Sequence, residues 1–304
     1  MQASIVGLGG VPGAIAQFLR HLENDRGSAA NTVAAYRNDL SQFSAFVQTY
    51  RGPQMDAFQA RELGQLGSEV LTAYVLGLRE KGYSAATVAR KVAAVKSFFA
   101  FATLSGLVRD NVAASLGSPR VARRAPQGVD AEDVQRLLEV GCAGETAESL
   151  RDRAMFTLLY HSGMRVSEMV GLDANDVEIE QAMVRCRGAR GTPRRIPLTA
   201  EAGIALDEYL TRGRAAVARS RGSEALFLNR RGARLTRQGF WLIMKTRAQS
   251  CGLRDRFTPH ALRHSFALRR VHEGTALKDL KDLLGVNLSA TQVYTRSAVE
   301  ARPS

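Results

Sequence analysis

The residues with the clearest chemical potential stand at the start of a predicted helix near the C-terminus. Thr258 is a favourable N-cap, and Pro259 suits the first helical position, where its missing N–H costs nothing. In that helix His260, Arg263 and His264 stand at positions i, i+3 and i+4, so they share one face. A guanidinium, an imidazole and the free N–H groups of a helix N-terminus together suit a phosphate oxygen. A helix cap with a solvated surface charge would give the same H-x-x-R spacing. Other segments are therefore needed to distinguish a phosphate site from this simpler interpretation.

Two further segments supply residues of matching chemistry. Gly163 fits the end of one helix and Arg165 the start of the next, and Tyr294 follows Gly285 near the end of the chain. Arg165 and Arg263 could hold the non-bridging oxygens of a phosphodiester and stabilise the charge of its pentacoordinate transition state. Tyr294 could attack the phosphorus. A free tyrosine has a pKa of about 10, and we expect the two arginines to lower the pKa of Tyr294 and favour the phenolate.

The order Arg165, His260-x-x-Arg263 and Tyr294, with these flanks, resembles the tyrosine recombinase (phage-integrase) family, most closely its two-domain Xer-type members. The resemblance runs from about residue 12 to residue 297. It implies that Tyr294 forms a 3′-phosphotyrosine and frees a 5′-hydroxyl, and that a 5′-hydroxyl of another strand reseals the break without ATP. His260 would bind the phosphate or help to remove the tyrosine proton. The sequence has no clustered carboxylates for divalent ions, and we expect neither a metal nor a cofactor.

Two positions depart from the family pattern. The family carries a hairpin lysine that protonates the leaving 5′-oxygen, but this chain has no lysine between Lys96 and Lys245. Arg190 is the nearest substitute, and with a pKa above about 12 it is a poor proton donor. Val286 stands where the family has His or Trp, and its side chain cannot hydrogen-bond a phosphate.

These losses keep an alternative open, a catalytically weak or inactive relative that binds DNA as an accessory factor. The retained spacing of Arg165, His260, Arg263 and Tyr294 favours an active enzyme. A relaxase similar to type IB topoisomerases shares the chemistry, but the separate helical N-terminal region and the lack of a long insert before the tyrosine disfavour it.

Composition supports a nucleic-acid partner. The chain of 304 residues is long enough for two domains, and 42 Lys and Arg against 29 Asp and Glu give a net charge of +13. Proteins that bind membranes or ribosomes can be equally basic. Three widely spaced cysteines indicate neither a disulfide framework nor a metal site. Since no signal peptide and no apolar run of about 18 residues is found, we expect a cytoplasmic protein without a membrane segment.

Periodicity predicts a mostly α protein with a small antiparallel sheet. We expect a helical core-binding domain over 1–114, a basic linker over 115–129 and a catalytic domain over 130–304. In the first domain a cap at Asn31-Thr32 is expected, and a helix from Ser84 has an apolar stripe. The opposite face of this helix fits an ordinary solvated surface. The resemblance to the tyrosine recombinase family implies instead a DNA-binding surface, with the candidates Thr87, Arg90, Lys91 and Lys96.

The second domain is expected to alternate helices with short strands at 177–179, 182–184, 195–198 and 226–228. Predicted helices cover 149–162, 201–219 and 275–284, and a capping box is expected at Asp130. The linker is either a plain tether or a hinge that closes both domains around a duplex. The linker and the basic hairpin over 187–194 add DNA-contact candidates. These are Arg120, Arg123, Arg124, Arg187 and Arg194, together with His264.

The expected partner is double-stranded DNA. Because recombination joins two duplexes and each protomer cuts one strand, we expect a tetramer on DNA. It would be a homotetramer, or a heterotetramer formed with a paralogous recombinase.

Overall fold

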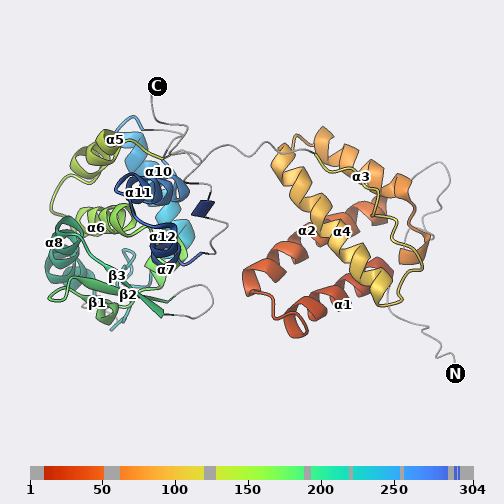
Figure 1. The fold of residues 1–304 in the computed structure, drawn as a ribbon, viewed down its shortest axis with the longest axis horizontal. Helices are drawn as coiled ribbons and strands as arrows, with labels where there is room; N and C mark the ends of the chain where they lie inside the picture. The colour runs from red at the N-terminus through yellow and green to blue at the C-terminus, as the bar shows by residue number, and fades with distance from the viewer. Residues whose placement is uncertain are drawn as a thin grey trace. The chain divides into compact units, whose positions relative to one another are not determined.

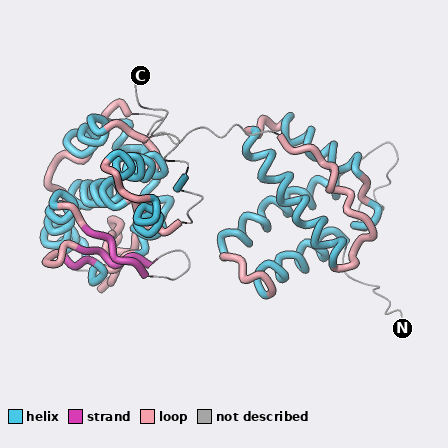
Figure 2. The backbone as a smooth tube through the Cα atoms, in the orientation of Figure 1, coloured by secondary structure: helices cyan, strands magenta, loops and turns pink. Residues whose placement is uncertain are grey.

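The computed structural model describes residues 10–50, 62–119, 128–187, 193–218, 222–253, 257–286, 291–292 and 294. The chain divides into two compact units, residues 1–123 and 124–304. Both are helical, and the second also holds a three-stranded antiparallel sheet (Figures 1 and 2), which confirms the predicted fold class. No helix in these ranges has the length and apolar character needed to cross a membrane.

The first unit is a helical bundle around one apolar core. Its helices are α1 (Gly10–Asn24), α2 (Ala30–Thr49), a short 3-10 turn (Leu63–Gln65), α3 (Ser68–Glu80) and α4 (Ala85–Leu104). Ser84 caps α4 by accepting a hydrogen bond from the Thr87 N–H, as predicted, and the stripe from Val88 to Phe99 is buried. The predicted cap at Asn31-Thr32 is wrong, because α2 begins at Ala30 without a side-chain cap.

Lys91 corrects the predicted DNA-binding face of α4. Its side chain is only 2% exposed, and its Nζ donates to Asp39 Oδ1 at 3.0 Å and to Gln42 Oε1 at 2.8 Å. Both partners come from α2, which packs against α4 and brings a carboxylate to a position that periodicity alone assigned to solvent. Arg90 pairs with the same Asp39 but stays 50% exposed. Lys91 therefore holds the bundle together and is unavailable to DNA.

The second unit follows the predicted order of helices and strands. Its sheet has the order β1-β2-β3, with Arg187 opposite Pro193. The elements are α5 (Ala131–Arg136), the π-helical η3 (Leu137–Gly141), α6 (Ala147–Ser162), α7 (Val166–Gly171), η4 (Ala174–Asp176), β1 (Val177–Glu178), β2 (Met183–Arg187), β3 (Pro193–Pro197), α8 (Ala200–Glu208), the π-helical η5 (Tyr209–Arg214), α9 (Ala215–Ala218), α10 (Arg237–Ser250), α11 (Pro259–His272) and α12 (Leu277–Leu284).

Three predictions differ in detail. The strand expected at 226–228 is reduced to isolated bridges, in which Ala225 pairs with Asp173 and Leu228 with Arg234. The helix expected over 201–219 is interrupted by the π-helical segment η5. Asp130 is the N-cap of α5, but its side chain makes no capping hydrogen bond.

Both ends of the predicted linker belong to folded cores. Leu116 packs in the core of the first unit, and Val129 in that of the second. The Val129 N–H donates to Ser265 Oγ at 2.6 Å, and this hydroxyl donates back to the Val129 carbonyl at 3.0 Å. Arg120, Arg123 and Arg124 lie outside the described residues.

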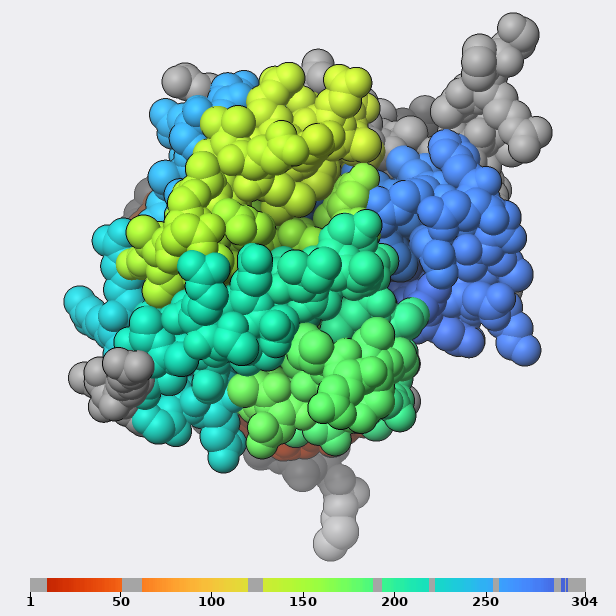
Figure 3. Space-filling view, turned by 90° about the vertical axis from the view of Figure 1, so that its left-hand side faces the viewer, coloured from red at the N-terminus to blue at the C-terminus, as the bar shows by residue number. Residues whose placement is uncertain are grey.

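Helix α6 is the centre of the second unit (Figure 1). Met155, Phe156, Leu158 and Leu159 are all buried, and α8 and α11 pack against the helix. In the space-filling view, α8 and η5 (teal) lie between the segment around α5 and α6 (yellow-green) and the strands (green), with α11 and α12 (blue) along one side (Figure 3). A helix surrounded in this way needs apolar residues on nearly every face, which explains its weak amphipathic pattern.

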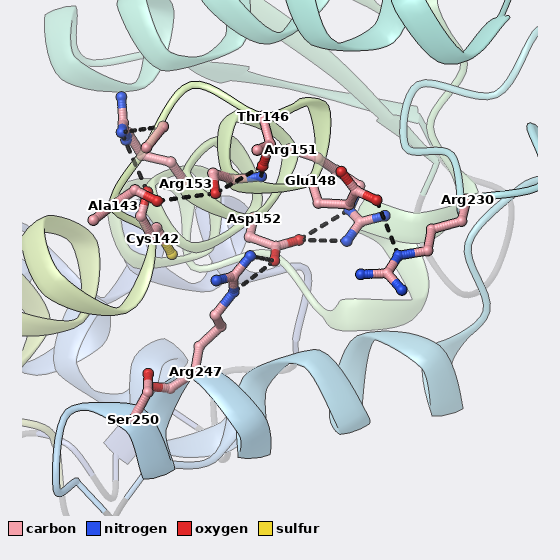
Figure 4. A network of polar contacts seen from close by, with 12 residues as sticks. Cys142, Ala143, Thr146, Glu148, Arg151, Asp152, Arg153, Arg230, Arg247 and Ser250 are labelled. Atoms are coloured by element: carbon pink, nitrogen blue, oxygen red, sulfur yellow. Dashed lines mark hydrogen bonds and ion pairs between the residues drawn. The ribbon is translucent and has the colours of Figure 1, made fainter.

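A buried charge network ties α6 to α10 (Figure 4). Asp152 lies between two arginines: Arg151 donates to Oδ1 at 2.9 and 2.7 Å, and Arg247 Nε donates to Oδ2 at 2.8 Å. Arg151 also donates to the Leu228 carbonyl at 2.9 Å. The network therefore fixes the position of α10, whose N-terminal turn borders the site described below.

We expect Asp152→Ala to lower the free energy of unfolding by about 3–5 kcal/mol, because it leaves the buried guanidinium of Arg151 and the partly buried guanidinium of Arg247 without their carboxylate. Urea-induced unfolding of the full chain measures this change. Arg230→Ala is the matched control, since Arg230 is 81% exposed and pairs with Glu148 in the same region; it should change stability by no more than about 1 kcal/mol. Equal effects of the two variants would contradict the assignment.

Candidate active site

Helix α11 starts as the sequence predicts. Thr258 Oγ1 accepts a hydrogen bond from the Ala261 N–H at 3.0 Å, and Pro259 occupies the first turn. His260 is exposed, Arg263 is 8% exposed and His264 is half-buried. The rings of His260 and His264 lie 6.5 Å apart, so the three side chains share one side of the helix.

Arg263 is held by two backbone carbonyls. Its Nη1 donates to the Gly163 oxygen at 2.5 Å and its Nη2 to the Leu284 oxygen at 2.6 Å. Gly163 ends α6 with φ +60°, and a Cβ there would lie 2.2 Å from Phe266, so only glycine fits. Burial and the nearby charge of Arg165 lower the pKa of Arg263 to about 10. Arg263 therefore stays charged at neutral pH and keeps further N–H donors for a ligand.

Arg165 is the N-cap of α7, also as predicted. Its backbone N–H donates to Glu168 Oε2 at 2.7 Å, and its Nη1 donates to Oε1 at 2.9 Å. Its Nη2 reaches the Gly285 carbonyl at 3.0 Å, and a third of the side chain stays exposed. The guanidinium is thus oriented by the protein on one side and open on the other.

Glu168 is the main residue that sequence reasoning missed. The buried carboxylate binds Arg194 through two hydrogen bonds of 3.0 and 2.9 Å in addition to its contacts with Arg165. Burial by itself raises the pKa of Glu168, but hydrogen bonds from Arg194 and the Arg165 backbone outweigh it, so that the pKa is lowered. The i, i+3 spacing of Arg165 and Glu168 at a helix start was the available signal.

Arg194 is a correction as well, because it was predicted to contact DNA. Its Nη1 and Nη2 bind Glu168, its Nε donates to the Leu283 carbonyl at 3.1 Å, and the side chain is largely buried. Arg194 therefore supports the site through buried contacts with Glu168 and the Leu283 carbonyl. Three consecutive carbonyls at the end of α12 thus accept hydrogen bonds from three arginines. Leu283 accepts from Arg194, Leu284 from Arg263 and Gly285 from Arg165.

Arg165, His260 and Arg263 border one open groove of about 990 Å³. Thr236 and Thr258, the N-caps of α10 and α11, lie on the same groove, so the positive ends of two helices add to its charge. The remaining lining residues are Met164, Val166, Ser167, Arg237, Gln238, Trp241, Pro259 and Val286. Such a groove suits an extended anion.

The contribution of α10 was also missed by sequence reasoning. Trp241 is 53% exposed, and Lys245 stacks over its ring at 5.3 Å. Arg237, Trp241 and Lys245 recur at intervals of four residues on the exposed side of the helix. That spacing was the available signal for a basic and aromatic surface beside the groove.

Tyr294 packs beside α11 rather than in the groove lining. Its side chain is 6% exposed among Phe266, Leu280 and Leu284, and its Oη lies 2.9 Å from His264 Nδ1. Burial raises the pKa of Tyr294 and the charge of Arg263 lowers it, with a net increase. The expectation of a lowered pKa is therefore wrong for this conformation, because the loss of hydration outweighs the arginine charge.

Several predicted contacts remain predictions. Arg190 lies outside the described residues, and Arg187 is exposed at the end of β2. In the first unit, Thr87 is half-buried and Lys96 Nζ donates to the Ala114 carbonyl at 3.3 Å.

Val286 packs against the apolar cluster that holds Tyr294. The three cysteines are free, and burial raises the pKa of Cys142 to about 12 and that of Cys186 to about 11. Within the described ranges, no group of His, Cys, Asp and Glu side chains could hold a metal ion.

Comparison with known proteins identifies the class of protein that this fold and site represent. Residues 127–301 match the model of the phage integrase family, and residues 15–106 match the N-terminal SAM-like domain of phage integrases. The chain is 46% identical over 281 residues to tyrosine recombinase XerC of Roseiflexus castenholzii, covering 91% of this chain and 87% of that protein. It is 36% identical over 297 residues to tyrosine recombinase XerD of Mycobacterium tuberculosis, covering 93% of each.

The fold recurs in the XerH site-specific recombinase bound to a palindromic difH substrate in a post-cleavage complex. The TM-score is 0.71 at 18% identity, over 94% of this chain and 82% of that one. The chain belongs to the phage integrase family, the tyrosine-type site-specific DNA recombinases.

We expect Glu168→Gln to destabilise the chain at pH 7 by about 3–5 kcal/mol, since Arg165 and Arg194 lose their shared buried counter-charge. A carboxylate with a lowered folded-state pKa stabilises fully above its ordinary value of 4.5 and loses this contribution as the pH falls through the folded-state value. The difference in unfolding free energy between the wild type and Glu168→Gln, measured from pH 7 to pH 3, should therefore decrease below a pH of about 4.5. Glu178→Gln serves as the control, since Glu178 on β1 is partly exposed and pairs with the exposed Arg185 and Arg195. A pH-independent difference for Glu168→Gln would contradict the prediction.

Proposed function

We propose that this protein cuts and rejoins DNA strands at specific sites through a covalent 3′-phosphotyrosine on Tyr294. The observation that carries the proposal is the groove that Arg165, His260 and Arg263 line together, with Tyr294 docked on the next residue of the same helix, His264. These are the side chains that binding and attack on a phosphodiester require.

In this proposal the scissile phosphate lies in the groove. Arg165 and Arg263 are already oriented by Glu168 and by the carbonyls of Gly285, Gly163 and Leu284, so binding costs little reorganisation. Their remaining N–H groups bind the non-bridging oxygens and stabilise the charge of the transition state. His260, exposed at the edge of the groove, adds a hydrogen bond to the phosphate.

Tyr294 then forms the bond to phosphorus, and the 5′-oxygen leaves. Because the phosphotyrosine conserves the energy of the broken bond, a 5′-hydroxyl of another strand reseals the DNA without ATP. Net charge and the basic groove support duplex DNA as the substrate. We propose a tetramer on two sites, formed by this chain alone or with a paralogue, and a cytoplasmic location beside the DNA.

A second candidate function, an accessory DNA-binding factor with weak or no cleavage, is favoured by one observation. Val286 lines the groove at a place where a hydrogen-bonding side chain would reach the phosphate. Loss of that contact lowers transition-state stabilisation without affecting duplex binding.

A nicked suicide substrate distinguishes the two functions. The wild-type protein should form a covalent DNA adduct on a denaturing gel, and Tyr294→Phe should abolish the adduct while retaining DNA affinity, because it removes only the nucleophilic oxygen. Tyr83→Phe is the matched control, since Tyr83 is partly exposed in the first unit and should leave the adduct unchanged. Site-specific binding without any adduct from the wild type would support the accessory function.

Arg90 and Lys91 provide a second test, on the first unit. Arg90→Ala should weaken DNA binding and lower the slope of log affinity against log salt by about 1, as expected for one lost phosphate contact. Lys91→Met should leave that slope unchanged and destabilise the unit, because it leaves the Asp39 carboxylate without its buried ammonium partner. Affinity titrations at several salt concentrations measure both effects, and a matching change in slope for Lys91→Met would refute its structural role.

A further inference from the structure

We propose that His264, and not His260, receives the proton of Tyr294 when this tyrosine attacks DNA. The inference rests on the proposed function and assigns one proton transfer within it. His264 was predicted to contact DNA, and the structure gives it another partner.

His264 Nδ1 and Tyr294 Oη lie 2.9 Å apart, which is hydrogen-bond distance, and the ring centroids are 5.5 Å apart. His264 is fixed on α11 directly after Arg263. Tyr294 is confined among Phe266, Leu280 and Leu284. The contact is therefore held by packing on both sides.

Burial lowers the pKa of His264, and the neighbouring His260 and Arg263 lower it further, so the imidazole is neutral at neutral pH. Among the described residues, these two groups and Tyr294 are the titratable and charged neighbours of His264. With its proton on Nε2, a neutral imidazole presents a free lone pair at Nδ1 to the phenol.

The two histidines of α11 have different surroundings. His260 is exposed and lines the groove, so it faces the phosphate, whereas His264 faces the tyrosine. Val286 cannot take up a proton at all. Within the described part of the site, His264 is the neutral base in contact with the nucleophilic oxygen.

The Oη–phosphorus bond forms while the proton of Oη passes to His264 Nδ1, and the phosphorus–O5′ bond breaks. The 5′-oxygen keeps that electron pair and takes a proton from water. The charge of Arg263 opposes an imidazolium beside it, but the bound phosphate compensates part of that charge. In resealing, the His264 imidazolium returns its proton to Oη as the tyrosine leaves.

The test compares His264→Asn and His264→Phe in single-turnover cleavage of a suicide substrate. The Asn oxygen replaces Nδ1 as a hydrogen-bond acceptor but cannot be protonated, whereas Phe retains the ring without an acceptor. We expect His264→Asn to slow cleavage about 100-fold or more, with unchanged DNA affinity. The wild-type rate should rise with pH through the titration of His264, and this limb should be lost in His264→Asn.

A 5′-bridging phosphorothiolate substrate separates nucleophile activation from leaving-group protonation, because a sulfur leaving group needs no proton. The defect of His264→Asn should persist with this substrate. His272→Asn, at the exposed end of α11, is the control and should match the wild type. Cleavage by His264→Asn within about threefold of the wild type, or its rescue by the phosphorothiolate, would overturn the proposal.

Two further measurements apply where the variants do not fold or where the wild-type protein does not cleave DNA. Nitrogen NMR of the histidine-labelled wild-type protein should show His264 as the neutral tautomer protonated at Nε2; a proton on Nδ1 would overturn the proposal without any variant. Absence of a wild-type adduct would reject the proposed function itself. A normal wild-type adduct together with full activity of His264→Asn would reject only the role of His264.

Discussion

Three like-charged guanidinium groups must lie close together in this site, and one buried carboxylate makes that arrangement possible. Glu168 binds Arg165 and Arg194 directly, and the last carbonyls of α12 accept one hydrogen bond from each of Arg165, Arg194 and Arg263. The negative end of a helix thus replaces further acidic residues. Acidic side chains in the groove would repel a phosphate, whereas a carboxylate behind the arginines and a helix end orient them and leave their outer N–H groups free.

The rest of the second unit holds these parts in register. Helix α6 ends at Gly163, whose left-handed backbone turns its carbonyl to Arg263, and α7 begins at Arg165 immediately afterwards. The network of Arg151, Asp152 and Arg247 fixes α10, so that its N-terminal turn faces that of α11 across the groove. The groove residues therefore belong to or flank α7, α10, α11 and α12, which are positioned by a core that none of the groove residues could form alone.

Burial changes the chemistry of individual side chains in ways that their types do not reveal. Lys91 is a structural cation because α2 supplies Asp39, while the adjacent Arg90 reaches solvent. Tyr294 has a raised pKa despite the nearby Arg263, because the effect of burial exceeds that of the arginine charge. The adjacent positions 263 and 264 thus differ in their surroundings: Arg263 borders the groove, whereas His264 contacts Tyr294.

The sequence by itself determined the fold class, the helix that starts at Thr258 and the break between Gly163 and Arg165, because capping residues and helical spacing are local properties. The set Arg165, His260, Arg263 and Tyr294 was predicted from the resemblance to the tyrosine recombinase family. Only the tertiary structure decided the roles of Glu168, Arg194, Lys91 and His264. Each depends on a partner far away in the chain: β3 brings Arg194 to Glu168, α2 brings Asp39 to Lys91, and the C-terminal segment brings Tyr294 to His264. Whether a charged side chain meets solvent, a counter-ion or a nucleophile is settled by long-range packing, and periodicity contains no information about which distant element supplies the partner.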